Sequence, residues 1–322
     1  MTASRRLRPL AGVLAAGVLA NVALAAPAAA YDWPRRLRPG AHGAHVRVLQ
    51  VRVAGWSTLS RPAQFVIDGD YGAATAAAVR AFETFYGIPH PNGVAGPKTF
   101  AKLNSLQDAD GSTKHFDFSE FVQRSSSSCS ARANAYAGTF GGGMVPEKTV
   151  RRNVRHLMWR LEAVRAKGGS HPIGINSGYR SVAYNDCIGG ASVSQHMYGT
   201  AADNRMAEVS NRRARDLAKL SQVHGIGCYS SQTHNHFDLR MDNAALSYAR
   251  AWWWPDRDSR GRDLDDNGVP CWGEVARTAA PMATVLEGVA EALPGAGSLV
   301  PSAAEIELFE RAGEPADLEG AD

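Results

Sequence analysis

The sequence predicts an α+β protein, with a small three-helix module followed by a mixed domain that contains an antiparallel sheet. Two observations predict this fold. Between residues 39 and 107, glycine-rich turns recur, and each opens an apolar stretch at helical spacing. Farther along, an amphipathic stretch begins at Pro146, stops at Gly168-Gly169 and leads into the strand-like residues 173–176. With 322 residues, 44% of them hydrophobic, the chain is long enough for two domains with cores of their own.

The N-terminus predicts export. Residues 1–30 contain three arginines and no acidic residue, and a small-apolar run in them ends at the cleavage-like sequence Ala28-Ala29-Ala30. This is the pattern of a secretory signal peptide, and an uncleaved membrane anchor is the alternative interpretation. No later stretch approaches the roughly 20 apolar residues of a spanning helix. We therefore expect a secreted protein without stable membrane association after signal removal.

The charge is unevenly distributed along the chain. The formal net charge is +4, yet the tail at residues 278–322 contains nine acidic residues and one basic residue. The tail lacks a sustained apolar pattern, and we expect it to be mobile. The body at residues 31–277 is therefore basic, which suits an anionic matrix. It has no five-residue basic run and no basic-aromatic stripe, so we expect no nucleic-acid partner. We expect a monomer.

The turns of the first module share the pattern Gly-x-x-Gly-x-x-(Val/Thr). The copies are Gly40-Gly43-Val46, Gly69-Gly72-Thr75 and Gly93-Gly96-Thr99. Around the second copy, the sequence reads Ile67-Asp68-Gly69-x-Tyr71-Gly72-x-x-Thr75-x-x-Ala78-Val79-x-x-Phe82. With this motif, residues 39–107 resemble the peptidoglycan-binding domain appended to many bacterial wall hydrolases. Glu83 departs from that family, in which glutamine is usual. The resemblance implies cell-wall targeting and peptidoglycan as a partner.

The chemistry-bearing residues lie in three motifs between residues 176 and 238. They are Ser177-Gly178-Tyr179-Arg180, Ser194-x-His196-x-x-Gly199-x-Ala201-x-Asp203 and His234-Asn-His236-Phe-Asp238. On one continuous helix, His196 and Asp203 would lie about 10 Å apart, whereas the ligands of a metal ion must converge. The chain must therefore turn back between them, and Gly199 supplies a turn. The alternating residues of the last motif would face one side of a strand. Together these residues indicate a metal site.

The three motifs resemble those of the zinc D-Ala-D-Ala carboxypeptidase family. That family lies in the broader group that joins such carboxypeptidases with lysostaphin-type peptidases and the hedgehog signalling domain. The resemblance covers about residues 115–240, and we place the peptidase domain at residues 115–275. It implies one Zn²⁺ ion held by His196, Asp203 and His236. It also implies hydrolysis of the D-Ala-D-Ala bond of peptidoglycan stem peptides, outside the cell.

The resemblance further implies roles for residues around the zinc ligands. Arg180 would hold the substrate carboxylate or carbonyl, Ser194 would also bind the substrate, and His234 would stabilise the developing oxyanion. The carboxylate that usually acts as the general base is missing, because Thr233 stands where many members of the family have Asp or Glu. Asp238 is the nearest carboxylate on the same strand face, and Asp242 is also close.

Asp238 is therefore our candidate general base, with a structural carboxylate as the alternative. Two other functions remain open: an endopeptidase that cuts peptidoglycan cross-links, and a non-catalytic wall-binding protein with a structural metal site. The missing carboxylate at Thr233 motivates the second of these.

Four cysteines in an exported chain predict disulfides rather than reactive thiols. Three pairings are possible from the residues themselves. The family resemblance favours Cys129–Cys187, which leaves Cys228–Cys271.

Overall fold

The computed structural model describes residues 31–59, 65–122, 129, 138–229, 233–240 and 252–255. The expected signal peptide, Asp242, Cys271 and the acidic tail lie outside these described residues. Within the described part of the chain, no helix is long and apolar enough to cross a membrane.

The helices of the first module begin where the glycine repeat predicts. Helices α1 (Ala44–Val53), α2 (Ala73–Phe85) and α3 (Pro97–Ser105) each follow a glycine of the repeat, and the 3-10 helix η1 (Ala54–Trp56) extends α1. Their apolar faces meet in one core that includes Val46, Leu49, Val53, Val79, Phe82, Phe100 and Leu103. The expected helical module is therefore confirmed.

Two of the turns in this module are held by equivalent side chains. Gln50 of α1 accepts a hydrogen bond from the backbone N–H of Gly69 at 2.8 Å. Glu83 of α2 accepts from the backbone N–H of Gly93 at 3.2 Å and from the hydroxyl of Thr99 at 2.6 Å. Because Glu83 acts here as an acceptor, a carboxylate serves where the resembled family usually has glutamine.

The second domain contains the long helix that the sequence predicts. Helix α4 (Glu147–Lys167) ends at Gly168, and the remaining helical elements are η3 (Phe118–Val122), α5 (Val182–Cys187), η4 (Gln195–Tyr198) and α6 (Asn211–Leu220). The sequence predicts that α6 extends to Val223, but the helix ends three residues earlier. The backbone of Gln222 has a φ of 58°, which is incompatible with a continuing right-handed helix.

A five-stranded sheet forms the centre of this domain. Its strands are β1 (Ile173–Ser177), β2 (Ala201–Met206), β3 (Gly225–Cys228), β4 (Asn235–Asp238) and β5 (Trp252–Pro255), and they are arranged in the order β1-β2-β4-β3-β5. Strands β1 to β4 pair antiparallel, which confirms the predicted α+β class. Strand β5 pairs parallel with β3 at the edge of the sheet.

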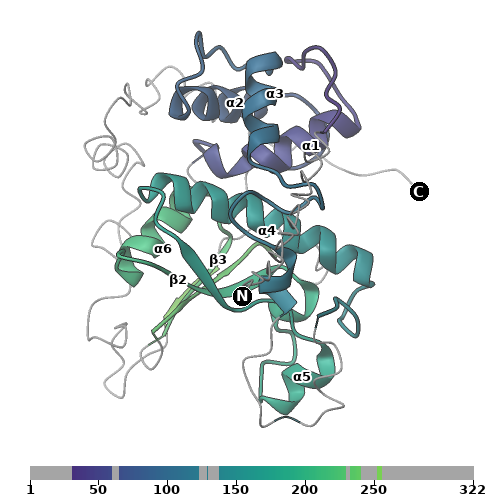
Figure 1. Cartoon of the computed structure of the whole chain (residues 1–322), viewed down its shortest axis with the longest axis vertical. Helices are drawn as coiled ribbons and strands as arrows, with labels where there is room; N and C mark the ends of the chain where they lie inside the picture. Colours follow the sequence, from purple (N-terminus) through teal and green to yellow (C-terminus); the bar gives the residue numbers. More distant parts are fainter. Residues whose placement is uncertain are drawn as a thin grey trace, which may run out of the picture.

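The two faces of the sheet have different coverings. Ala202 and Met206 of β2 and Phe237 of β4 belong to the core that the sheet shares with α4. Because side chains alternate along a strand, Asp203 and His236 lie on the opposite face. Figure 1 shows α4 between the sheet and the first module. The expected metal ligands are therefore on the side of the sheet that faces away from α4.

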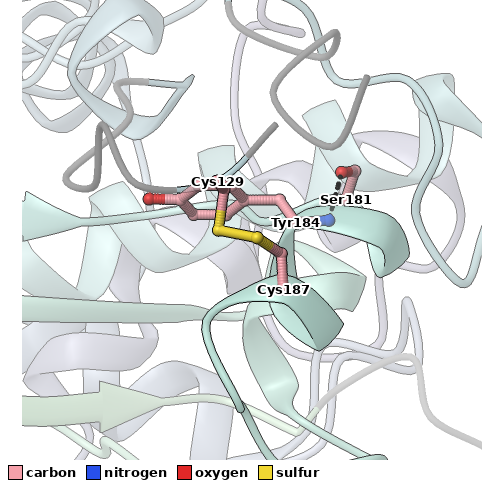
Figure 2. The surroundings of a disulfide bond; sticks show 4 residues. All are labelled: Cys129, Ser181, Tyr184 and Cys187. Atoms are coloured by element: carbon pink, nitrogen blue, oxygen red, sulfur yellow. Dashed lines mark hydrogen bonds between the residues drawn. A yellow bond between two sulfur atoms is a disulfide. The ribbon is translucent and has the colours of Figure 1, made fainter. Parts of the chain in front are cut away.

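One predicted disulfide lies within the described residues. Cys129 and Cys187 are bonded, with their Cα atoms 5.8 Å apart, and this confirms that pairing. The bond ties the segment ahead of α4 to the end of α5, beside Tyr184 (Figure 2). The backbone N–H of Tyr184 donates to the hydroxyl of Ser181, which caps α5. Cys228 is disulfide-bonded, but its expected partner Cys271 lies outside the described residues, so that pairing stays a prediction.

Candidate metal centre

The three expected zinc ligands come from three different elements. His196 lies in η4, Asp203 in β2 and His236 in β4. Helix η4 ends at Gly199, whose φ of 72° reverses the chain into β2, as the spacing predicts. A Cβ at this glycine would lie 2.7 Å from the side chain of Val150 in α4, so the turn also needs glycine for close packing.

The ligand atoms converge at one point. Asp203 and His236 are directly opposite each other in the β2–β4 ladder. The Asp203 Oδ1 atom lies 3.0 Å from His236 Nδ1 and 3.3 Å from His196 Nε2, and the two nitrogens are 3.2 Å apart. All three residues are buried. Among the described residues, no second group of three His, Cys, Asp or Glu side chains converges in this way.

The hydrogen bonds on the far sides of the two imidazoles fix which nitrogens face the centre. The carbonyl of Gly178 lies 2.6 Å from His196 Nδ1 and can only accept, so this nitrogen carries the proton. The Asp238 carboxylate likewise accepts from His236 Nε2 at 3.1 Å. His196 Nε2 and His236 Nδ1 are then lone-pair atoms that face the Asp203 oxygen. Three lone-pair atoms this close suit a bound cation, and two imidazoles with a carboxylate suit Zn²⁺.

The pKa of each of the three residues depends on its burial and on its neighbours in the cluster. Burial lowers the pKa of His196. Burial alone would raise the pKa of Asp203, but the two neighbouring histidines hold it well below its usual range. Burial alone would lower the pKa of His236, whereas its bonds to Asp203 and Asp238 raise it to about 9. Without a metal, His236 therefore carries a second proton near neutral pH, and a bound cation takes the place of that proton.

Arg180 holds the second oxygen of the Asp203 carboxylate. Its Nη2 donates to Asp203 Oδ2 at 2.6 Å, and its Nε donates to the hydroxyl of Ser177 at 3.0 Å. One carboxylate oxygen thus faces the histidines while the other is neutralised by the guanidinium. The expected substrate role of Arg180 stays a prediction, and its contact with Asp203 positions an expected metal ligand.

The other expected site residues lie around the centre. His234 Nε2 is 3.9 Å from Asp203 Oδ1, and the His234 side chain is 18% exposed. Ser194 is half-buried and directly precedes η4. Thr233 is exposed, and its carbonyl accepts a hydrogen bond from the side chain of Asn211 at 2.9 Å. These positions are compatible with the expected roles of His234 and Ser194, and they leave residue 233 without a carboxylate.

Asp238 lies in a different place from the one expected of a general base. Its side chain is fully buried, and it contacts the nitrogen of His236 that points away from the centre. Its carboxylate also pairs with Arg240, a contact that the sequence did not indicate. A Cβ at Gly225 of β3 would lie 2.0 Å from Asp238 Oδ2, so this glycine makes room for the carboxylate. Asp238 orients His236, which is the structural alternative left open by the sequence.

The arrangement matches known protein families. Residues 114–238 match the family described as peptidase M15, and residues 42–103 match the family described as a putative peptidoglycan binding domain. A curated relative, the zinc D-Ala-D-Ala carboxypeptidase of Streptomyces albus G, is 42% identical over 173 residues. The match covers 54% of this chain and 62% of the relative, so the chain spans less than two thirds of that protein's length. Residues 114–238 are therefore similar to the peptidase M15 family, and they follow residues that are similar to a peptidoglycan-binding domain.

Proposed function

We propose that this protein is an exported zinc peptidase that hydrolyses the D-Ala-D-Ala bond of peptidoglycan stem peptides. The observation that carries the proposal is the buried convergence of His196 Nε2, Asp203 Oδ1 and His236 Nδ1. The similarity to the Streptomyces albus G carboxypeptidase supports the substrate class. The matched peptidoglycan-binding domain supports action at the cell wall.

Each residue of the site would have a separate role in hydrolysis. His196, Asp203 and His236 would hold one zinc ion, which when bound supplies Lewis-acid polarisation of a carbonyl and lowers the pKa of a water ligand. Arg180 keeps Asp203 in place through the 2.6 Å bond to its outer oxygen. His234 is partly exposed beside the same carboxylate, where a donor can stabilise the negative charge that develops on the substrate oxygen.

A first experiment tests the metal centre. The protein purified without its signal segment should contain about one equivalent of zinc, and His196→Ala should lose it. His171→Ala is a matched control, because His171 pairs with Glu208 at 3.2 Å outside the metal centre. Full zinc content in the His196→Ala protein would contradict the ligand assignment.

A second experiment separates the three candidate functions. A carboxypeptidase releases D-Ala from a soluble pentapeptide stem, and an endopeptidase shortens cross-linked dimers. The non-catalytic wall-binding protein, which the exposed Thr233 favours, would bind zinc and sacculi without doing either. Release of D-Ala by the zinc-loaded protein, lost in His196→Ala, is the expected result.

A further inference from the structure

Arg205 lies two residues after the expected ligand Asp203 in strand β2. In the β1–β2 ladder, Ser177 is opposite Asp203 and Gly174 is opposite Arg205. The register shifts between Ile175 and Ser177, so a bulge lets Gly174 and Ser177 both pair with residues of the metal-bearing face. Because side chains alternate along β2, Arg205 projects from the same face as Asp203.

On the other side of β2, strand β4 places residues beside Asp203 and Arg205 on the same face of the sheet. Asp203 pairs with His236 and Asn204 pairs with Asn235, so the next step of this antiparallel register brings Arg205 opposite His234. Two residues along a strand span about 7 Å. The Cα atom of Arg205 therefore lies about 7 Å from that of Asp203. It is beside His234, the histidine expected to stabilise the oxyanion.

Arg205 is available to bind a ligand. It is the exposed residue in an otherwise buried strand. Among the described residues, no hydrogen-bond acceptor or carboxylate pairs with its guanidinium. Its neighbour Gly174 is also exposed, and a Cβ built there would meet nothing within 4 Å. The surface beside Arg205 is consequently open, whereas the guanidinium of Arg180 is already engaged by Asp203.

These observations point to a specific anionic group of the substrate. We propose that Arg205 binds the free C-terminal carboxylate of the stem peptide and so makes the enzyme a carboxypeptidase rather than an endopeptidase. The inference rests on the proposed peptidase function. In a D-Ala-D-Ala substrate, the terminal carboxylate lies one residue beyond the scissile carbonyl, within about 3.8 Å of chain. A guanidinium can bind both carboxylate oxygens, whereas a cross-link through an amine with no neighbouring carboxylate offers no such group.

The test compares two peptides with the zinc-loaded protein. One ends in D-Ala-D-Ala with a free carboxylate, and the other is the same peptide with a C-terminal carboxamide. The parent protein should cleave the acid faster. Arg205→Gln should lower kcat/KM for the acid by about 10- to 100-fold, lower kcat/KM for the amide by a clearly smaller factor, and retain full zinc content. Arg205→Lys should keep part of the preference because it keeps the charge.

A matched control removes an arginine from the other side of the sheet. Arg165 lies in the last turn of α4, and Arg165→Gln should leave the preference for the acid intact. Equal losses on both peptides, or an unchanged preference in Arg205→Gln, would overturn the role of Arg205 while the peptidase function stands. A parent that cleaves both peptides equally would do the same. A zinc-loaded parent that cleaves neither peptide would overturn the proposed function and this inference with it.

Discussion

Asp238 connects His236, a proposed metal ligand, to the protein interior, and this connection is testable by one substitution. Asp238→Asn removes the charge that accepts from His236 Nε2 while it keeps the size of the side chain. Loss of such an outer partner typically weakens metal binding about 10- to 100-fold. We expect chelator competition to show this loss, and we expect turnover to recover at saturating zinc. A general base would behave differently, with unchanged zinc affinity and turnover that stays low.

A control for Asp238→Asn is available on the surface. Glu208 also accepts from a histidine, His171, but it is highly exposed and lies beyond the end of β2, outside the expected ligand cluster. Glu208→Gln should leave zinc affinity unchanged.

Gly225 predicts a second effect at the scale of single residues. Its missing side chain leaves space for the Asp238 carboxylate, which a Cβ would approach to 2.0 Å. Gly225→Ala should therefore destabilise the fold by about 1–3 kcal/mol in urea unfolding, and zinc binding should weaken with it. Gly174→Ala is the matched control because it is also a strand glycine and its Cβ would enter open space. Equal stability of the two variants would contradict the steric argument.

At the scale of elements, helix α4 joins the two halves of the chain through Lys167, a half-buried lysine. Lys167 Nζ donates to the carbonyl of Gly55 in η1 at 2.7 Å and to the carbonyl of Leu220 at the end of α6. Burial lowers the pKa of Lys167 to about 7. An unfolded lysine has a pKa near 10.4, so between about pH 7 and pH 10 the unfolded chain binds more protons than the folded chain.

The free energy of unfolding should consequently rise with pH across that window. We expect the stability difference between the parent and Lys167→Met to shift in favour of the parent by up to about 1 kcal/mol per pH unit from pH 7 to pH 10. Urea unfolding at several pH values measures it. Lys148→Met, at an exposed lysine in the first turn of α4, is the control and should show a constant difference. A constant difference for Lys167→Met as well would contradict the shifted pKa.

At the scale of the whole molecule, the two domains share part of a core. Trp159 and Ala163 of α4 belong to the hydrophobic cluster of the first module, while Leu157 and Leu161 of the same helix belong to the cluster beneath the sheet. Buried Arg160 adds a hydrogen bond to the carbonyl of Val51 at 3.2 Å. The first module is thus packed on α4, on the side of the sheet opposite the candidate metal centre.

This shared helix predicts cooperative unfolding of the full chain. Calorimetry should show one transition for both domains because neither cluster is complete without α4. Trp159→Ala should lower the stability of that single transition by about 3–5 kcal/mol. Two well-separated transitions, with Trp159→Ala moving one of them, would show instead that the modules unfold independently.

Local patterns in the sequence predicted much of this molecule. Glycine spacing predicted the starts of α1, α2 and α3, and apolar periodicity predicted α4, because turns and amphipathic helices depend on neighbouring residues. The turn at Gly199 was predictable for the same reason. The ligand set followed from a family motif, and the structure brings those three residues together.

Long-range pairing decided the rest. The strand pairing of β5 with β3 and the contact of Asp238 with Arg240 depend on how distant or bent segments meet, which no local pattern encodes. Alternation along β4 correctly put His236 and Asp238 on one face, but it could not tell which side of the imidazole the carboxylate would contact. The sequence by itself determined the helices of the first module, α4, the turn at Gly199 and the set of candidate ligands. The tertiary structure decided which atoms face the metal centre, because that depends on the register between strands and on the hydrogen bonds behind each imidazole.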